Sequence, residues 1–317
     1  MIRYLANRFI HAAVVLLAVS IAVFFVMYKA GDPVELLLPP DASQIQVEEM
    51  REHLGLNAPF MVQYSTFLKN AIKGDVGKSF IYGQPALNVV LERLPATLEL
   101  ATFAMILAVA LGIPLGVIAS IRPDSFPSKT IMFFSLAGIS VPTFWMGMIL
   151  VLIFSVTWGV LPSSGRADLP YFTSFLSLDG IKHLLLPGIT LCLFQLALIL
   201  RLTKSGMMEV LLQDYIKLAR AKGLPQYMVI FPHALKNTLI PVVTIIGIQF
   251  GELIAFTIVT ETIFAWPGTG KLIIDSIQNL DRPVVVAYLM IVALIFVIIN
   301  FAVDIVYTFI DPRVHSK

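Results

Sequence analysis

Long apolar runs separated by short polar segments dominate the chain. A run of about 20 mainly apolar residues can cross a bilayer as a helix, because a helix rises about 1.5 Å per residue and the hydrocarbon layer is about 30 Å thick. Six runs meet this condition, at approximately Phe9–Tyr28, Ala96–Ile121, Lys129–Trp158, Lys182–Thr203, Thr238–Ile263 and Val284–Ile310. The pattern therefore predicts an all-α polytopic membrane protein with six transmembrane helices.

Composition agrees with this pattern and excludes several classes of protein. The chain of 317 residues is 58% hydrophobic and 13% charged, with a mean hydropathy of +0.87, which is too apolar for a soluble globular protein. A formal net charge of +2 gives no basis for binding nucleic acid. The single cysteine, Cys192, lies inside an apolar run, so it predicts neither a disulfide framework nor a thiolate metal site.

The distribution of lysine and arginine beside the predicted spans indicates how the chain crosses the membrane. Cytoplasmic connections are enriched in these two residue types. The denser set of connections carries Arg3, Arg8, Arg122, Lys129, Arg201, Lys204, Lys217, Arg220, Lys222, Lys236, Arg313 and Lys317. Both termini and the loop at about 204–237 are therefore predicted to be cytoplasmic, and residues 29–95 to be extracytoplasmic.

This orientation divides the predicted protein into two parts. Residues 1–95 hold the first span and an extracytoplasmic insertion between the first two spans, with helices expected at Val47–Leu54 and Phe60–Ile72. Residues 96–317 form a core of five helices that includes the cytoplasmic loop. Prolines and glycines in these spans bend helices or let them approach closely. They are Gly112, Pro114, Gly116, Gly138, Pro142, Gly147, Gly247 and Gly251.

The most polar long segment of the chain, DYIKLARAKGLPQYMVIFPHALKN, occupies Asp214–Asn237. It predicts a helix at Tyr215–Lys222, with Asp214 as its N-cap and Gly223 as its stop. Two turns of helix are too short to be stable alone in water, so this helix needs a surface to bind. The side that suits a groove of a cytoplasmic partner protein carries Tyr215, Leu218, Ala219 and Lys222. The alternative is a helix that lies at the headgroups of the membrane lipid.

Two short segments look like phosphate-binding loops but lack part of the motif. They are GDVGKS at Gly74–Ser79 and PGTGK at Pro267–Lys271. The full motif needs a glycine five residues before the Gly-Lys pair, and those positions hold Ile72 and Ala265. If a nucleotide drives this protein, another chain must therefore bind it.

The run ARAKGL in the cytoplasmic loop resembles the EAA loop of ABC importer permeases, in the form found in dipeptide, oligopeptide and nickel permeases. Ala219, Gly223 and Pro241 match the pattern, whereas Lys217 and Leu218 stand where the general pattern has Glu and the first Ala. Seven further motifs, spread over nearly the whole chain, resemble family motifs and occur in the family's order. They are GDP (31–33), LGLNAP (54–59), GDVGKS (74–79), LPATLEL (94–100), HALKN (233–237), ETIFAWPGTG (261–270) and DPR (311–313).

One residue departs from the family pattern at a predicted outer surface. Arg282 stands where the family usually has an aromatic residue. This change either alters contact with a binding protein or has no functional effect.

The resemblance implies the type I ABC importer permease fold and a place in the bacterial cytoplasmic membrane. It implies an ATP-driven, binding-protein-dependent importer in which this subunit forms half of the translocation pathway. Its partners would be a second homologous permease, two cytoplasmic ATPase subunits and an extracytoplasmic solute-binding protein. This chain would hold no cofactor and catalyse nothing, because the ATPase subunits bind ATP and magnesium.

The same resemblance implies that the 214–224 helix couples the permease to the ATPases. The residues expected to carry this coupling are Asp214, Tyr215, Ala219, Arg220 and Gly223. Dipeptides or oligopeptides are the first expectation for the solute, and nickel or other metal chelates and glutathione-like solutes are the alternative within the class. An ion-coupled secondary transporter or channel is the alternative outside it, and would predict inverted repeats and paired intramembrane charges.

Ionisable residues within spans are functional candidates by default. Glu252 lies about 20 Å from the start of its span, so we expect it to line a pathway and meet a peptide ammonium or a cation, or else to bond within the bundle. Glu261 is expected at the membrane interface, and Asp304 is expected to pair with Arg313. Glu99 is a further candidate. The five histidines show no metal-ligand spacing, and no catalytic constellation is recognisable.

Overall fold

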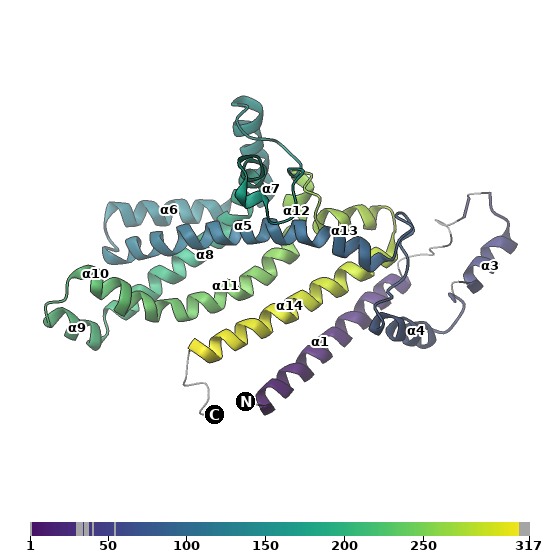
Figure 1. Cartoon of the computed structure of the whole chain (residues 1–317), viewed down its shortest axis with the longest axis horizontal. Coiled ribbons are helices and arrows are strands. Elements are labelled where there is room, and N and C mark those ends of the chain that lie inside the picture. Colours follow the sequence, from purple (N-terminus) through teal and green to yellow (C-terminus); the bar gives the residue numbers. More distant parts are fainter. Residues whose placement is uncertain (1, 30–33, 35–37, 40, 54, 311–317) are drawn as a thin grey trace. The chain divides into compact units, whose positions relative to one another are not determined.

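The computed structural model describes residues 2–29, 34, 38–39, 41–53 and 55–310. Its regular elements are helices, shown in Figure 1. They form two compact units. The first contains residues 1–95 and 267–297, and the second contains residues 96–266 and 298–317.

In the first unit, aromatic side chains join a long helix, α1, to a short one, α4. The helices of this unit are α1 (Ile2–Lys29), α3 (Gln44–His53), α4 (Phe60–Ile72), the start of α5 (Ala86–Ile121), α13 (Thr269–Gln278) and the first part of α14 (Arg282–Ile310). Phe24 of α1 lies 5.5 Å from the Phe60 ring and 5.2 Å from the Phe67 ring of α4, centroid to centroid. The hydroxyls of Ser20 and Tyr64 are 2.8 Å apart, which adds a polar link between the same helices.

The GDVGKS segment forms a structural turn in this unit. Gly77 N donates to Asp75 Oδ1 at 2.9 Å, and Gly77 has φ of +99°, a conformation that favours glycine. Ser79 Oγ donates to Asp281 Oδ2 at 2.5 Å, and Phe80 N donates to Asp281 Oδ1 at 3.1 Å. Ser79 and Asp281 are both buried. The segment therefore binds the residue that precedes α14.

The second unit is arranged around α8, which packs against α6, α7, α11 and α12. Its elements are α5 (Ala86–Ile121, from Ala96 onward), α6 (Phe126–Ser140), α7 (Thr143–Leu150), η1 (Val151–Thr157), η2 (Ser174–Leu176), α8 (Leu178–Leu211), α9 (Asp214–Ala221), α10 (Gln226–Met228), η3 (Val229–Leu235), α11 (Lys236–Phe256) and α12 (Ile258–Ile263). A Cβ at Gly116 of α5 would lie 2.6 Å from Thr203 Cβ of α8. This confirms that a small residue allows two spans to approach closely.

Several described helices are long and apolar enough to cross a membrane. They are α5, α8, the continuous segment Gln226–Phe256 and, from α14, Arg282–Val303, which makes four. A fifth candidate is a broken pair, and Ala13–Val26 of α1 is a shorter apolar segment. The all-helical membrane architecture is therefore confirmed, and the exact number of six spans stays a prediction.

The predicted third span, Lys129–Trp158, is not one helix. Helix α6 ends at Ser140, and α7 with η1 follows at an angle of 103°, a turn visible in Figure 1. Pro142 precedes α7, and Val141 before it is extended, with φ of −90° and ψ of 127°. A residue before proline is disfavoured in helical conformation, which explains the break at this position.

Candidate functional site

Helix α9 has a well-defined C-terminus, but no side chain caps its N-terminus. Gly223 has φ of +78°, its N–H bonds to Arg220 O at 2.9 Å, and Leu224 N bonds to Ala219 O at 3.3 Å. These are the bonds of a Schellman motif, so Gly223 is confirmed as the stop. Asp214 is the first helical residue, whereas the N-cap is Gln213, which makes no side-chain cap bond. The prediction of Asp214 as N-cap is therefore wrong.

One side of α9 packs on its own chain. Ile216 is fully buried and Ala219 is 8% exposed. They join a cluster with Val117, Met207, Val229, Ile230 and Ala234, which come from α5, α8 and η3. The sequence predicts Ala219 on the free side of the helix, beside Tyr215, but the structure buries it in this cluster. The helical periodicity of the sequence defines the two sides of α9, but it does not show which side packs against the rest of the chain.

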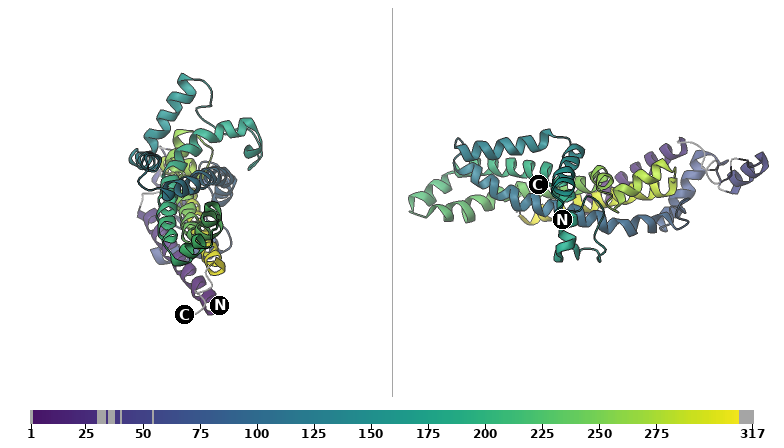
Figure 2. Two further views of the ribbon diagram at one scale, coloured as in Figure 1. Left: turned by 90° about the vertical axis from the view of Figure 1, so that its left-hand side faces the viewer. Right: turned by 90° about the horizontal axis from the view of Figure 1, so that it is seen from above.

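The opposite side of α9 is exposed and partly apolar. Tyr215 is 42% exposed and Leu218 is 56% exposed. Arg220 and Lys222 are exposed as well. Neighbouring residues add a wider apolar surface, with exposed side chains at Leu212, Tyr227, Met228 and Phe231. Figures 1 and 2 show α9 and α10 together at the end of the second unit where α8 ends and α11 begins. Apolar side chains gathered at a polar end of a bundle are typical of a protein interface.

Hydrogen bonds fix the Tyr215 side chain to the start of the next span. Asn237 Nδ2 donates to Tyr215 Oη at 2.7 Å. The Tyr215 hydroxyl donates to the His233 carbonyl at 3.4 Å. Helix α9 is thus joined to η3 and α11 by polar contacts at its edge and by apolar packing beneath it.

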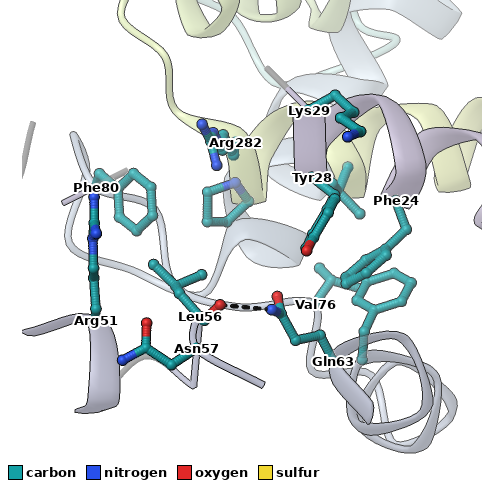
Figure 3. A pocket seen from close by; sticks show the side chains of 13 residues that line it. Phe24, Tyr28, Lys29, Arg51, Leu56, Asn57, Gln63, Val76, Phe80 and Arg282 are labelled. Carbon is teal, nitrogen blue, oxygen red and sulfur yellow. Dashed lines mark hydrogen bonds between the residues drawn. The ribbon is translucent and has the colours of Figure 1, made fainter. Parts of the chain in front are cut away.

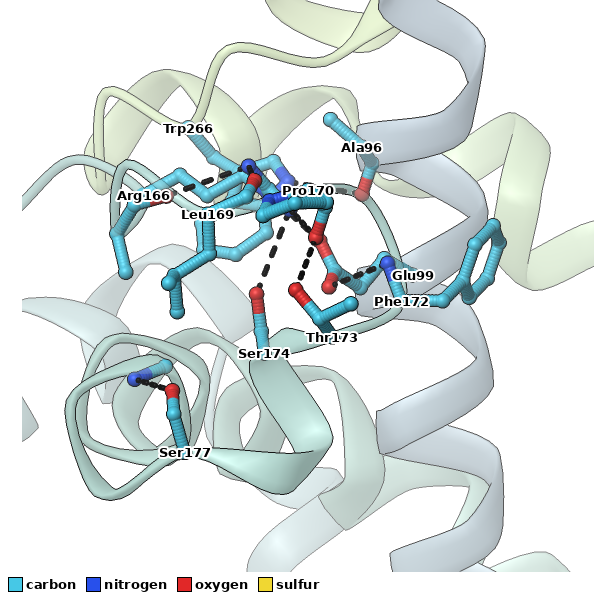
Figure 4. A network of polar contacts seen from close by, with 12 residues as sticks. Ala96, Glu99, Arg166, Leu169, Pro170, Phe172, Thr173, Ser174, Ser177 and Trp266 are labelled. Atoms are coloured by element: carbon cyan, nitrogen blue, oxygen red, sulfur yellow. Dashed lines mark hydrogen bonds and ion pairs between the residues drawn. The ribbon is translucent and has the colours of Figure 1, made fainter.

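A second group of polar residues lies at the start of the α5 span, and its centre is a buried ion pair. Arg166 Nε lies 2.6 Å from Glu99 Oε2. The Arg166 guanidinium also donates to the carbonyls of Ala167, Leu169 and Pro170, while Phe172 N donates to Glu99 Oε1 at 3.0 Å. Figure 4 shows these groups converging from the loop before α8 onto α5. We call this set, with Tyr171 and Ser174, the outer network, after the extracytoplasmic side on which the lysine and arginine distribution predicts it.

The ETIFAWPGTG segment binds the same part of α5. Thr97 Oγ1 donates to Glu261 Oε1 at 2.7 Å, and Trp266 Nε1 donates to the Ala96 carbonyl at 2.9 Å. Glu261 and Trp266 are fully buried. Glu261, which was expected at the membrane interface, is thus a buried hydrogen-bond acceptor inside the unit.

Glu252 has a different environment from Glu99 and Glu261. It is partly exposed and lines a cavity of about 450 Å³ between α7, α8, α11 and α12. Within the part of the chain that the structure describes, its carboxylate takes part in no hydrogen bond or ion pair. The same described residues contain no group of three or more His, Cys, Asp or Glu side chains that could hold a metal ion. The Asp304 side chain and Arg313 lie outside the described residues, so their predicted pairing stays a prediction.

The first unit has a cavity of its own, of about 580 Å³. Figure 3 shows Lys29, Arg51 and Arg282 around it, together with the rings of Phe24, Tyr28 and Phe80. Gln63 Nε2 donates to the Leu56 carbonyl at its wall, at 2.9 Å. Arg282, the residue that departs from the family pattern, therefore lies at a cavity wall.

The sequence matches two descriptions of one transport family. Residues 112–316 match "Binding-protein-dependent transport system inner membrane component". Residues 1–101 match the corresponding N-terminal region, "Binding-prot-dependent transport system membrane comp, N-term". This chain belongs to that family. It is a non-catalytic permease subunit of the inner membrane, and membership of this class of ABC transport systems implies a binding protein and an ATPase as partners.

Relatives of this permease match it from end to end. The "Dipeptide transport system permease protein DppB" of Alkalihalophilus pseudofirmus is 39% identical over 99% of both chains. The "Oligopeptide transport system permease protein AppB" of Bacillus subtilis is 40% identical, again over 99% of both. Among solved structures, the inward-facing MetNI methionine ABC transporter aligns with a TM-score of 0.56 at 16% identity. That alignment covers 72% of this permease and 98% of the solved chain, and shows a shared fold.

Proposed function

We propose that this permease imports dipeptides and oligopeptides. The observation that carries the proposal is identity of 39% and 40% over 99% of the chain with permeases named for dipeptide and oligopeptide transport. Both alignments include the helices around the cavity beside Glu252 as well as the family motifs. Metal chelates and glutathione-like solutes are the alternatives that a transport assay distinguishes.

The proposed assembly pairs this chain with a second, similar permease, two cytoplasmic ATPase subunits and an extracytoplasmic binding protein. The ATPase subunits bind ATP and magnesium. We further propose six spans in the type I permease fold of a bacterial cytoplasmic membrane, with both termini cytoplasmic. Residues 1–95 would then supply the first span and an extracytoplasmic region, and residues 96–317 the five-helix core. The apolar segment Ala13–Val26 and the broken α6–α7 pair supply the two spans beyond the four unbroken ones.

The proposed coupling element is α9, through Asp214, Tyr215, Ala219, Arg220 and Gly223. Ala219 attaches α9 to the rest of the chain by packing in the buried cluster, and Gly223 ends the helix. Tyr215 and Arg220 lie on the exposed surface. Because α9 is attached to the end of α8 and the start of α11, movement of a docked ATPase is transmitted to both spans. Such movement shifts the inward–outward equilibrium only through a difference in contact free energy between the two states.

Helix α5 connects the outer network to the cluster that packs against α9. Glu99 belongs to the outer network, and Val117 packs beneath α9. Their separation of 18 positions in one helix corresponds to about 27 Å, close to the thickness of a bilayer core. This supports a cytoplasmic α9 and an extracytoplasmic outer network.

Co-purification tests the proposed assembly. The chain is extracted gently from native membranes, and the associated proteins are identified for the wild type, Leu218→Glu and Leu176→Glu. Both leucines are exposed, Leu218 on α9 and Leu176 on η2, and the proposed topology puts η2 on the extracytoplasmic side. We expect an ATPase and a second permease with the wild type and with Leu176→Glu, and loss of the ATPase with Leu218→Glu. Recovery of the wild type without an ATPase, under conditions that keep other complexes intact, would contradict the proposal.

A further inference from the structure

The cavity beside Glu252 combines one carboxylate with aromatic and uncharged polar groups. Helix α11 provides Glu252, and α8 provides Thr190 and Gln195. Its aromatic residues are Phe144 of α7, Phe194 of α8 and Phe256 of α11. A volume of about 450 Å³ lies within the usual range of small-ligand sites, about 300–1,000 Å³.

Glu252 differs from Glu99 and Glu261, the two fully buried glutamates of this unit, in having no partner among the described residues. Glu99 is paired with Arg166, and Glu261 accepts from Thr97. Both of those carboxylates are fully buried. A carboxylate inside an apolar helix bundle is costly unless a cation, a proton or hydrogen-bond donors satisfy it. Glu252 instead faces a cavity into which such a group can enter.

The other polar groups of the cavity are held in place by bonds behind them. Gln249 Nε2 donates to Gln195 Oε1 at 3.2 Å, and both glutamines are buried. Thr190 Oγ1 donates to the Leu186 carbonyl at 2.8 Å. These bonds fix Gln195 and Thr190 at the wall, so Glu252 is the charged group at this site that is available to a solute.

The aromatic rings favour the same kind of ligand. A cation close to the face of a phenylalanine ring is attracted by the ring quadrupole, and the attraction increases where water is excluded. Phe144 and Phe194 are each 49% exposed. Rings that remain open at the cavity can therefore contact either an ammonium group or an apolar side chain next to it.

We propose that this cavity is a transient binding site for the terminal ammonium group of a peptide during translocation, with Glu252 as its counter-ion. The proposal rests on the proposed function, because it takes a peptide as the solute. One carboxylate gives weak binding, which suits a pathway that a solute must enter and also leave. Glu252 contacts the solute, whereas Gln195 and Gln249 are positioning residues.

Transport by the complete importer tests the proposal. The permease with its partner subunits and binding protein is reconstituted in vesicles, and ATP-dependent uptake is measured for a peptide and its N-acetylated form. Binding of both peptides to the binding protein is measured first. The same binding protein is used with every permease variant, so its own selectivity cancels when the variants are compared with the wild type. For Glu252→Gln we expect the preference for the free ammonium to fall about tenfold, mainly through KM, with most of it restored in Glu252→Asp. Asp124→Asn, which removes an exposed carboxylate from the loop between α5 and α6, should keep the wild-type preference.

A second measurement does not depend on transport. Cys192 is the only cysteine, so Cys192→Ala gives a background in which Val259→Cys, 47% exposed at the cavity wall, reports alone. The rates of modification by a cationic and an anionic methanethiosulfonate of similar size are compared with Glu252 and with Glu252→Gln. We expect the cation-to-anion rate ratio to fall several-fold in the glutamine variant.

The two measurements separate failure of this inference from failure of the proposed function. If the wild type imports peptides but Glu252→Gln leaves both the peptide preference and the modification ratio unchanged, the ammonium site is wrong and the importer stands. If Glu252→Gln does not assemble, the modification ratio measured on the isolated permease decides, and an unchanged ratio overturns the site. If the complete wild-type importer takes up no peptide under any condition, the proposed function and the ammonium ligand both fail.

Discussion

Arg166 Nε lies 2.6 Å from Glu99 Oε2, and the two side chains are 9% and 0% exposed. Arg166 belongs to the loop between η1 and α8, whereas Glu99 lies near the start of the α5 span. The guanidinium also lies 4.6 Å from the centre of the Tyr171 ring. A single arginine thus holds a long loop against an apolar helix.

Removal of one partner from this ion pair should be strongly destabilising, because it leaves the other charge buried without compensation. We expect Arg166→Gln to lower the free energy of unfolding by about 3–5 kcal/mol. Thermal unfolding of the detergent-solubilised permease measures this. Arg122→Gln, at an exposed arginine, is the matched control and should leave the unfolding temperature unchanged. The Glu99→Gln/Arg166→Gln double variant should lose less than the sum of the single losses, and strictly additive losses would contradict a direct pair.

Gly116 should be sensitive to a single added methyl group. A Cβ there would meet Thr203 Cβ at 2.6 Å and the Leu200 carbonyl oxygen at 2.8 Å, so α5 and α8 must separate. We expect Gly116→Ala to destabilise by about 1–3 kcal/mol, as overpacking does. Gly138→Ala is the control, because the nearest atoms to its Cβ lie 3.9 Å away on Leu193, and it should be neutral or gain up to about 1 kcal/mol of helix propensity. Equal unfolding temperatures for the two variants would show that the helices do not approach this closely.

Tyr215→Phe tests the proposed mechanical role of α9. The variant keeps the ring but removes the hydroxyl that bonds to Asn237 and to the His233 carbonyl. Its loss should cost about 0.5–1.5 kcal/mol, enough to loosen the edge of α9 without unfolding it. In the reconstituted importer we expect fewer peptides transported per ATP hydrolysed, with ATPase binding retained. Asn237→Ala should give the same change, and an unaltered transport-to-hydrolysis ratio in both variants would argue against this role.

Local sequence signals predicted much of the fold. The apolar pattern gave Phe60–Ile72 as a helix with the bounds observed for α4, and Gly223 ends α9 as its conformational freedom suggests. These features depend on neighbouring residues alone. The break at Pro142 was less predictable, since proline can bend a span without ending its helix.

Tertiary contacts account for what the sequence did not reveal. Arg166 pairs with a residue 67 positions away, and nothing in either segment identifies its partner. Helical periodicity puts Ala219 on the same face as Tyr215 and Leu218, but it does not show which face the chain's own core covers, and Ala219 is buried in that core. Glu252 was singled out as an intramembrane carboxylate, but its cavity is formed by four helices and required the structure.

ATP-dependent uptake of a labelled dipeptide is the direct readout of whether α9 transmits ATPase action to peptide import. The complete importer is reconstituted with wild-type permease, Leu218→Glu or the outer-side control Leu176→Glu. We expect uptake by the wild type and by Leu176→Glu, and a loss of at least tenfold for Leu218→Glu with the permease still folded. Equal uptake by all three proteins, or uptake that does not require ATP, would contradict this role of α9.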